Sequence, residues 1–217
     1  MKEMFTGIVE GKGKVLEIDE RPGGRALRVD VGAFAKRLRM GSSVALNGCC
    51  TTVVKFDDHS FVTELMEITL QKTNLGDVKV NSPLNLEFPM VLGAELGGHM
   101  VQGHVDGVGV VEEVQMLESS HIIKIRLPEF LTKYVVATGS VAVNGVSMTI
   151  ADIRGDVFTL GVIPHTWEVT NFSEFKPGVR VNIEVDLIGK YIEKLLPDLW
   201  TRLSREPQTK AEEANRV

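Results

Sequence analysis

The sequence predicts an all-β protein built from two copies of one small domain and followed by a single C-terminal helix. Three observations support this prediction. Two motifs recur later in the chain, each copy contains short β-like runs broken by glycine or Asn-Gly, and apolar residues change to helical spacing near the C-terminus. A chain of 217 residues is long enough for two domains of this kind.

The duplication is visible in two pairs of segments. The chain reads MFTGIVEGKGKV from Met4 and MVQGHVDGVGVV from Met100, and both fit M-x-x-G-x-V-[ED]-G-x-G-x-V. It also reads SVALNGCCTTV from Ser43 and SVAVNGVSMTI from Ser140, which are identical at six of eleven positions. The offset is 96 residues in the first pair and 97 in the second. Solenoid repeats are usually much shorter, so this period indicates a duplicated domain.

Each copy contains six runs that are typical of β-strands. Six short strands, spaced about a dozen residues apart, favour a small closed barrel or a sandwich over alternating strands and helices. Short helical turns are expected at Gly32 to Leu38 and at Pro128 to Tyr134, which are equivalent places in the two copies. The runs are GKVLEI, ALRVDV, SVAL, TTVVKF, SFVTEL and PLNLEF in the first copy, and GVGVVEEV, IIKIRL, SVAV, MTIADI, VFTLGVI and VRVNIEV in the second.

After the second copy, the apolar residues from Leu187 to Leu203 fall on one broad face of a helix. This face either packs on the chain's own barrels or joins subunits. The second interpretation is favoured because each barrel has its own core. Pro197 is expected to kink or restart the helix. The predicted organisation is an N-terminal barrel at residues 1–98, a C-terminal barrel at 99–187, an oligomerisation helix at 188–204 and a disordered tail at 205–217.

Composition excludes several classes of protein. The formal net charge is −5 with both signs interspersed, so nothing indicates a nucleic-acid or anionic-membrane partner. No apolar run is long enough to span a bilayer, and the N-terminal MKEMFTG lacks the apolar core of a secretory signal. The only two cysteines, Cys49 and Cys50, are adjacent and poorly suited to a disulfide, so a cytoplasmic location is expected. No histidine makes a recognised metal-ligand spacing with them, so no metal is predicted.

Small polar residues follow the Asn-Gly turn of each copy, in the arrangements Cys50-x-Thr52 and Ser147-x-Thr149. Alternate residues of a strand share a face, so these side chains can together bind a polar ring. Taken alone, the threonines are better explained by ordinary β propensity, and a lone cysteine is more often a buried apolar side chain. The duplication adds weight to the functional interpretation, because equivalent positions have acquired different reactive groups. Cys50 is replaced by Ser147, and Ile8 is replaced by His104.

Five motifs, in order, resemble the α-type riboflavin synthase family: MFTGIVE, NGCCTTV, TNLGD, GGHMVQGHVDG and NGVSMT. The resemblance covers residues 4–196. It implies two six-stranded Greek-key barrels, a C-terminal helix and a homotrimer, with lumazine synthase as a candidate partner. It also implies that two molecules of 6,7-dimethyl-8-ribityllumazine dismutate, by transfer of a four-carbon unit, to riboflavin and 5-amino-6-(ribitylamino)uracil. Because that transfer is internally balanced, no cofactor is expected.

The resemblance places each site between the N-terminal barrel of one subunit and the C-terminal barrel of another. Thr138, where some family members carry lysine, is a further expected contact. The N-barrel pocket is predicted to be lined by Gly7, Ile8, Val9, Cys50, Thr51, Thr52, Glu64, Leu65, Met66, Glu67, Ile68, Thr69, Gly103, His104 and Val105. The C-barrel pocket is predicted to be lined by Ser147, Met148, Thr149, Gly161, Val162, Ile163, Pro164, His165 and Thr166.

Five residues are assigned chemical roles. His104 is the first candidate for removing a proton from the 7-methyl group, because histidine is the side chain that ordinarily titrates near neutral pH. Cys50 and Ser43 are candidates for adding to the partner ring or positioning it, with Ser147 in the opposite half. Asp186 is expected to orient a group or accept a proton. Holding two rings face to face supplies much of the acceleration.

The competing function is that of a non-catalytic lumazine- or flavin-binding optical protein with the same double barrel. Such relatives have lost much of the polar set, notably the paired cysteines and the histidine of the GHV-type loop. This chain keeps Cys49, Cys50, His99 and His104, which favours the enzyme.

Overall fold

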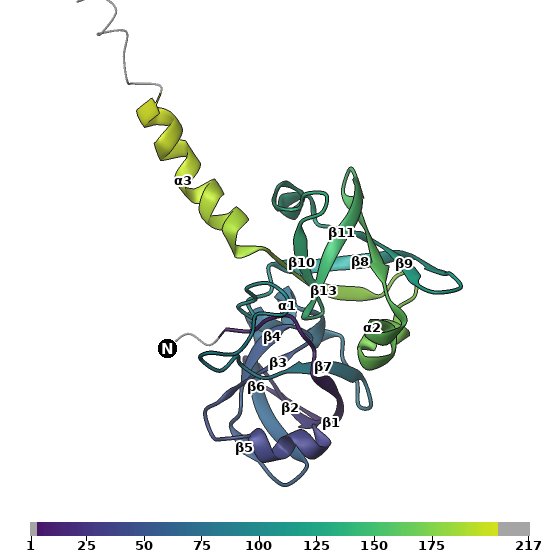
Figure 1. The fold of residues 1–217 in the computed structure, drawn as a ribbon. Helices are drawn as coiled ribbons and strands as arrows, with labels where there is room; N and C mark the ends of the chain where they lie inside the picture. The colour runs from purple at the N-terminus through teal and green to yellow at the C-terminus, as the bar shows by residue number, and fades with distance from the viewer. Residues whose placement is uncertain (1–3, 204–217) are drawn as a thin grey trace, which may run out of the picture. The chain divides into compact units, whose positions relative to one another are not determined.

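The computed structural model describes residues 4–203 and divides into two compact units. The first unit ends at Asp186 and contains both copies of the repeat (Figure 1). The second begins at Leu187 and contains one helix, α3. All of the candidate site residues therefore belong to the first unit.

The second copy closes into a six-stranded barrel. Around the barrel the strands follow the order β10-β11-β12-β9-β8-β13, and all pairs are antiparallel. Numbered from the first strand of the copy, neighbours run 1-2-5-4-3-6, which is a Greek-key connection. The strands are β8 (Gly107–Met116), β9 (His121–Arg126), β10 (Ser140–Val143), β11 (Val146–Arg154), β12 (Val157–Val162) and β13 (Arg180–Val185).

The first copy has the same connection but forms a seven-stranded sheet, in the order β4-β3-β7-β1-β2-β6-β5. The prediction of six strands in this copy is therefore corrected. β4 and β5 lie at opposite edges of the sheet and are adjacent in sequence, so together they take the place of the single strand β11. The strands are β1 (Gly11–Arg21), β2 (Gly24–Asp30), β3 (Ser43–Leu46), β4 (Cys49–Thr52), β5 (Lys55–Phe56), β6 (Ser60–Met66) and β7 (Pro83–Glu87).

A change of hydrogen-bond partner explains the broken strand. The Val53 N–H donates to the Ser42 carbonyl at 2.9 Å, on the side of β3, whereas the Val54 N–H donates to Val62 of β6 at 2.9 Å. In the second copy, the chain makes the same switch at Ile150 through a β-bulge that leaves the strand continuous.

Short helices cover the barrel ends. The predicted turns are confirmed as η1 (Gly32–Arg37) and η3 (Glu129–Tyr134). Two corner helices that the sequence pattern did not indicate follow β6 and β12, and each continues into a 3-10 turn. They are α1 (Glu67–Lys72) with η2 (Asn74–Gly76), and α2 (Pro164–Val169) with η4 (Asn171–Glu174).

Each copy has its own apolar core. Phe61 and Leu27 lie at the centre of the first, and Phe158 and Ile125 lie at the centre of the second; all four are fully buried. A third, smaller cluster of Phe5, Ala45, Val101 and Ala142 joins the two copies. Phe5 and Val101 are equivalent residues, and each donates its N–H to the carbonyl of the other, at 2.8 and 3.1 Å. The copies are thus related by an approximate two-fold axis.

A network of buried asparagines also joins the copies. Asn74 Nδ2 donates to Asn144 Oδ1 at 3.0 Å, and the equivalent Asn171 Nδ2 donates to Asn47 Oδ1 at 2.9 Å. Hydrogen bonds run both ways across the axis, so the amides satisfy one another where water is excluded. The Asn-Gly turns therefore form part of the interface as well as closing hairpins. The six asparagines are Asn47, Asn74, Asn85, Asn144, Asn171 and Asn182.

The second unit confirms the predicted helix: α3 spans Leu187–Leu203. It is continuous through Pro197, so the helix does not restart there. Proline removes only its own N–H from the helical hydrogen bonds, and the neighbouring bonds remain.

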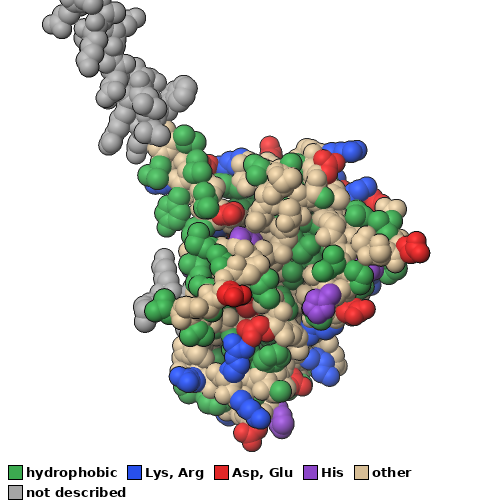
Figure 2. Space-filling view, in the orientation of Figure 1, with side chains coloured by type: hydrophobic (Ala, Val, Ile, Leu, Met, Phe, Trp, Pro, Cys, Tyr) green, Lys and Arg blue, Asp and Glu red, His purple; other side chains and the backbone are tan. Residues whose placement is uncertain are grey.

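The predicted tail at residues 205–217 lies outside the described residues. Among those described, no helix is long and apolar enough to cross a membrane. Acidic and basic side chains are interspersed on the face of the molecule drawn in Figure 2.

Candidate active site

The hairpin after each Asn-Gly turn carries a polar outer face. In the first copy, Cys50 and Thr52 point outward from β4, and Thr52 pairs with Ser43 of β3. In the second copy, Ser147 and Thr149 occupy the equivalent places on β11, and Thr149 pairs with Ser140 of β10. Ser140 was not predicted, although the 97-residue offset from Ser43 indicates it. We call these two surfaces the Cys50 face (Ser43, Cys50, Thr52) and the Ser147 face (Ser140, Ser147, Thr149).

Two predicted lining residues of these strands point the other way. Thr51 is buried, and its hydroxyl donates to the Val44 carbonyl at 2.9 Å. Met148, its equivalent, packs against the core of the second barrel. Their assignment to the pockets is corrected, because side chains alternate along a strand.

The segment that leads into each copy crosses to the other barrel. The Ser147 N–H donates to the Gly7 carbonyl and the Cys50 N–H donates to the Gly103 carbonyl, each at 2.8 Å. A Cβ on either glycine would lie 2.6 Å from the Cβ of the residue it faces, and φ is +76° at Gly7 and +77° at Gly103. Only glycine fits this close approach in this conformation.

Because the leading segments cross, some residues predicted to line the pocket of one barrel lie beside the other barrel. Gly7, Ile8 and Val9 were assigned to the N-barrel pocket, but Gly7 contacts Ser147 and Val9 packs against the core of the second barrel. Ile8, half-exposed, follows the same segment. The predicted partners of Cys50 do lie on its side: Gly103 contacts it, exposed His104 follows, and Val105 packs against the core of the first barrel.

A histidine that the site prediction omitted lies beside the Ser147 face. Nδ1 of His99 is 2.7 Å from the Ser147 hydroxyl, and Nε2 is buried without a hydrogen-bond partner among the described residues. Burial lowers the pKa of His99, against the opposing effect of the Asp186 carboxylate, so the imidazole is neutral at pH 7. His99 thus contacts the Ser147 hydroxyl directly, whereas predicted Asp186 acts on the imidazole only through its charge. The motif GGHMVQGH already contains His99, but only the fold brings it to Ser147.

The two cysteines differ in environment. Cys49 faces the core of the first barrel and is buried, and burial raises the pKa of its thiol to about 12. It is therefore protonated at neutral pH and unable to act as a nucleophile. Cys50, on the outer face, is only partly buried and is the thiol available to a ligand.

The predicted corner residues lie where β6 meets α1 in the first copy and where β12 meets α2 in the second. Leu65 and Val162 are buried in the two cores, so those two side chains do not line a surface pocket. Glu64 is more than half exposed and is paired with Arg21 at 2.6 Å, so it binds another group only by giving up this ion pair. The remaining predicted corner residues lie at the surface: Met66, Glu67, Ile68 and Thr69 in the first copy, and Gly161, Ile163, Pro164, His165 and Thr166 in the second.

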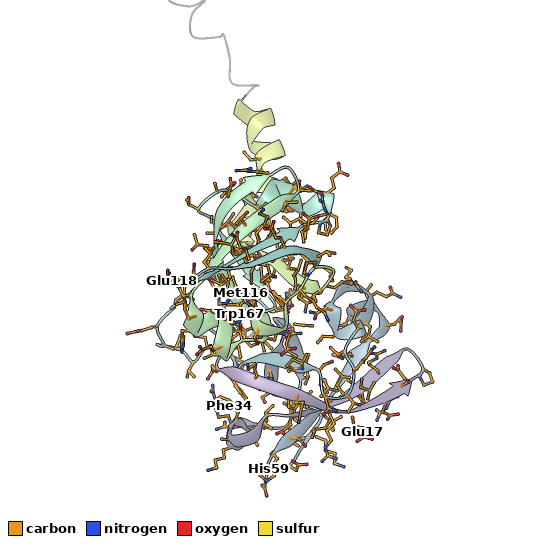
Figure 3. The ribbon with its side chains drawn as sticks, turned by 90° about the vertical axis from the view of Figure 1, so that its right-hand side faces the viewer. Glu17, Phe34, His59, Met116, Glu118 and Trp167 are labelled. Atoms are coloured by element: carbon orange, nitrogen blue, oxygen red, sulfur yellow. The ribbon has the colours of Figure 1, made fainter. Side chains whose placement is uncertain are left out.

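The two corners present different surfaces. In the second copy, the Trp167 ring stacks on His121 with centroids 4.0 Å apart, and Figure 3 shows Trp167 near Met116. The equivalents of Trp167 and His121 in the first copy are Leu70 and Arg25, beside the Arg21–Glu64 pair. The second corner is therefore aromatic and the first is charged.

Thr138 lies in the turn before β10. It is exposed and has a φ of +62°, where the equivalent Gly41 has +77°. Its N–H donates to the Ile150 carbonyl at 2.9 Å. This hydrogen bond fixes β11 at the residue where the strand changes from pairing with β10 to pairing with β12.

Among residues 4–203, no three histidine, cysteine, aspartate or glutamate side chains are grouped closely enough to hold a metal ion.

Comparison with known proteins agrees with this architecture. The model of the lumazine binding domain matches the chain twice, over residues 6–89 and 102–186. A riboflavin synthase of Photobacterium phosphoreum is 41% identical over 196 residues, covering 89% of each chain. A riboflavin synthase of Bacillus subtilis (strain 168) is 36% identical over 208 residues, covering 96% of this chain and 97% of the relative.

Solved structures share the fold. The crystal structure of LumP complexed with riboflavin superposes with a TM-score of 0.79 at 24% identity, covering 83% of this chain and 98% of that chain. LumP complexed with 6,7-dimethyl-8-(1'-D-ribityl) lumazine superposes with a TM-score of 0.77 at 22% identity, with the same coverage. With the duplicated family match and the identity to curated relatives over most of its length, the chain belongs to the lumazine-binding domain family and, within it, to the riboflavin synthases.

Proposed function

We propose that this protein is a riboflavin synthase, a transferase that converts two molecules of 6,7-dimethyl-8-ribityllumazine into riboflavin and 5-amino-6-(ribitylamino)uracil. One observation carries the proposal: the same scaffold presents the Cys50 face in one copy and the Ser147 face, with His99 and Asp186, in the other. Two identical substrates with opposite roles require two similar binding faces with unlike chemistry.

The geometry supports different tasks for the two faces. His104 is exposed beside the Cys50 face, which suits proton transfer at the 7-methyl group. Cys50 and Ser43 are placed to bind or add to the ring on that face. On the other face, the Ser147 hydroxyl is held by a neutral His99, which suits hydrogen bonding to the second lumazine.

We also propose that each complete site is shared between two chains of a homotrimer. Within one chain, Phe5, Ala45, Val101 and Ala142 fill the space between the two hairpins, so two rings cannot stack there. A face from a second chain must then oppose each face of the first. Association with lumazine synthase stays a prediction of the family resemblance. The adjacent cysteines, neither of which is in a disulfide, favour action in the reducing cytoplasm.

The activity is tested by incubating the purified protein with 6,7-dimethyl-8-ribityllumazine alone and separating the products by chromatography. We expect one riboflavin and one 5-amino-6-(ribitylamino)uracil for every two lumazines consumed. Tight lumazine binding without turnover would instead place the protein with the optical proteins.

The shared site is tested by complementation. Cys50→Ala and Ser147→Ala chains, each impaired alone, are co-expressed and purified as mixed assemblies. If sites are shared, about a quarter of them combine two intact faces by random pairing, and activity rises above that of either variant. If each site lies within one chain, the mixture stays as inactive as its components, which would contradict the proposal.

A further inference from the structure

Two carboxylates near the C-terminal ends of β7 and β13 are buried and accept backbone hydrogen bonds. Glu87 and Glu184 are equivalent residues, and each is only 4% exposed. Glu87 accepts hydrogen bonds from the Thr6 N–H at 2.6 Å, the Thr6 hydroxyl at 2.8 Å and the Gly7 N–H at 3.1 Å. Glu184 accepts from the Gln102 N–H at 2.7 Å.

Burying a carboxylate is unfavourable, so its retention at both equivalent positions calls for a specific role. Burial raises the pKa of Glu87, although the hydrogen bonds from Thr6 and Gly7 act in the opposite direction. An amide or hydroxyl side chain would satisfy a backbone N–H with a smaller desolvation cost. The Glu87 carboxylate instead fixes two consecutive peptide groups with both of its oxygens, which a single amide oxygen cannot do, and Glu184 fixes one peptide group through Oε1.

The peptide that each carboxylate holds runs directly into the opposite half of the site. Glu87, from the first barrel, holds Thr6 and Gly7, and the Gly7 carbonyl accepts the Ser147 N–H of the second barrel at 2.8 Å. Glu184, from the second barrel, holds Gln102, and the carbonyl of the next residue, Gly103, accepts the Cys50 N–H of the first barrel at 2.8 Å.

We propose that Glu87 and Glu184 are positioning residues that form a crossed brace. Glu87 places Ser147 in the other barrel, and Glu184 places Cys50 in the other barrel. Each carboxylate therefore controls the face of the copy to which it does not belong. The functional part of this inference rests on the proposed reaction, in which these two faces hold the two substrates. The structural part does not.

The structural part is tested without any turnover. The chain contains only two cysteines, so ¹⁵N-cysteine labelling yields two backbone amide signals, and Cys50→Ala identifies them. We expect Glu184→Gln to shift the Cys50 amide signal and Glu87→Gln to leave it in place. With ¹⁵N-serine labelling, the Ser147 amide should respond to Glu87→Gln and ignore Glu184→Gln. A response only within the barrel that carries the mutation would overturn the crossed brace.

The functional part is tested by double-mutant cycles on kcat. Glu87→Gln should lower kcat about tenfold to a hundredfold, since small displacements of positioned groups have effects of that size. Its effect should largely vanish in Ser147→Ala and persist in Cys50→Ala, and Glu184→Gln should show the reverse pattern. Equal effects in both backgrounds would show a general structural role and contradict the proposal.

Two further comparisons keep the test decisive if Glu87→Gln fails to fold. Thr6→Ala removes the hydroxyl bond to Glu87 and the bond that this hydroxyl accepts from the Ile8 N–H, keeps the backbone bonds to Glu87, and should move the Ser147 amide but not the Cys50 amide. At the equivalent position, Gln102→Ala is the matched control, because Gln102 bonds Glu184 through its backbone. Glu113→Gln, an exposed carboxylate paired with Lys124, controls for loss of charge. If each mutation shifts the amide of the opposite barrel but the protein has no turnover, the brace is supported and the proposed function is refuted. If the protein turns over but each mutation shifts only amides of its own barrel, the proposed function is supported and the brace is refuted.

Discussion

Single replacements at equivalent positions distinguish the two halves of this molecule. Cys50 and Ser147 have the same backbone environment, since each amide donates to a leading-segment glycine at 2.8 Å. Only the side-chain atom differs, a thiol in one copy and a hydroxyl in the other. Likewise Ile8 and His104 follow equivalent glycines. In the proposed reaction, the duplicated backbone binds both substrates alike, and these few atoms assign them different roles.

The Asp186 carboxylate, whose charge acts on the His99 imidazole beside Ser147, has no counterpart in the first copy. The residue equivalent to Asp186 is Pro89, which has no titratable group. The second half therefore combines a hydroxyl with a neutral histidine and a carboxylate, whereas the first half combines a thiol with the exposed His104.

The buried Cys49 thiol predicts a loss of stability at alkaline pH. Burial raises its pKa from 9.0 to about 12, so its contribution to stability is fully present below pH 9 and is lost as the pH rises toward 12. Within that window, the free energy of unfolding should fall by up to about 1.4 kcal/mol per pH unit because of this group. Urea unfolding of the wild type and of Cys49→Ala, measured across the window, checks the prediction.

The comparison between the two proteins matters more than either curve, because other groups also titrate at alkaline pH. Cys49→Ala should start less stable, since it leaves a small cavity in the core of the first barrel, but should show a shallower decline. Parallel curves for the two proteins would mean that Cys49 does not ionise during alkaline unfolding.

Among the elements, the Asn-Gly hairpins and the corner turns hold the two barrels together. Each asparagine bonds an element of the other copy, and the bonds occur in equivalent pairs, such as Asn85 Nδ2 to the Asn144 carbonyl at 2.9 Å and Asn182 Nδ2 to the Asn47 carbonyl at 2.8 Å. The Gly48 and Gly145 backbones meet so closely that a Cβ on Gly48 would lie 2.6 Å from the Gly145 nitrogen. Each half thus presents a surface complementary to its own equivalent.

The first copy expressed alone, as residues 4–96, should fold and bind a lumazine or flavin but lack turnover, because it has a core but only one of the two faces. We expect it to form a symmetric dimer, since a second copy supplies the partners that Asn47, Asn74 and Asn85 lose. Buried polar groups without partners cost about 1–3 kcal/mol each, which favours this pairing. Sedimentation and riboflavin formation check the two expectations.

Asn85→Ala in the same fragment is the appropriate control. It removes an amide that donates across the axis and leaves the apolar core of the barrel intact. The dimer of this variant should be weaker, so it should dissociate at a higher protein concentration than the dimer of the unmodified fragment. Substantial turnover by either fragment would show that unlike faces are unnecessary.

At the scale of the whole molecule, the C-terminal helix is a unit of its own with an apolar surface. In its first part, α3 exposes five large apolar side chains, which are Ile188, Tyr191, Ile192, Leu195 and Leu196. These recur three and four positions apart and so share one face. Burying one aliphatic side chain of this kind contributes roughly 1.5–3 kcal/mol, so several together favour association.

Ending the chain after Asp186 should leave the double barrel folded but dissociated and nearly inactive, because complete sites would then be lost with assembly. Light scattering and riboflavin formation measure both properties, and circular dichroism verifies the fold. Leu195→Glu should act in the same direction, and Lys194→Gln, a change next to it at an exposed position, should have little effect. A truncated protein that stays trimeric, or an active monomer, would contradict helix-driven assembly.

Much of the fold could be predicted because its signals are local. Alternating residues in runs such as SVAV and VRVNIEV, and turns at Asn47 and Asn144, identify strands and hairpins from a few neighbouring residues. The corner helices α1 and α2 were missed because six residues are too few to show a helical period. The break between β4 and β5 was missed because it results from a switch of partner strands, which leaves no trace in the run TTVVKF.

The candidate site could be predicted only where its residues lie close together in the sequence, as they do along a single strand. Cys50, Thr52, Ser147 and Thr149 were correctly expected to alternate along outer faces. Gly7 to Val9 were assigned to the wrong barrel, because nothing in MFTGIVE shows that this segment crosses to a strand far along the chain. The brace residues Glu87 and Glu184 align in the repeat, yet burial alone distinguishes them from solvated carboxylates.

The sequence by itself determined that the chain is duplicated, that each copy is a small β domain, that a helix follows, and that the copies differ in their reactive groups. These properties depend on residue type and on spacing, which the chain carries in one dimension. Only the tertiary structure decided that Ser147 meets His99, that each leading segment serves the opposite barrel, and that buried asparagines and carboxylates join the halves. Hydrogen bonds and desolvation act over a few ångströms, and that proximity exists only once the two barrels have packed together.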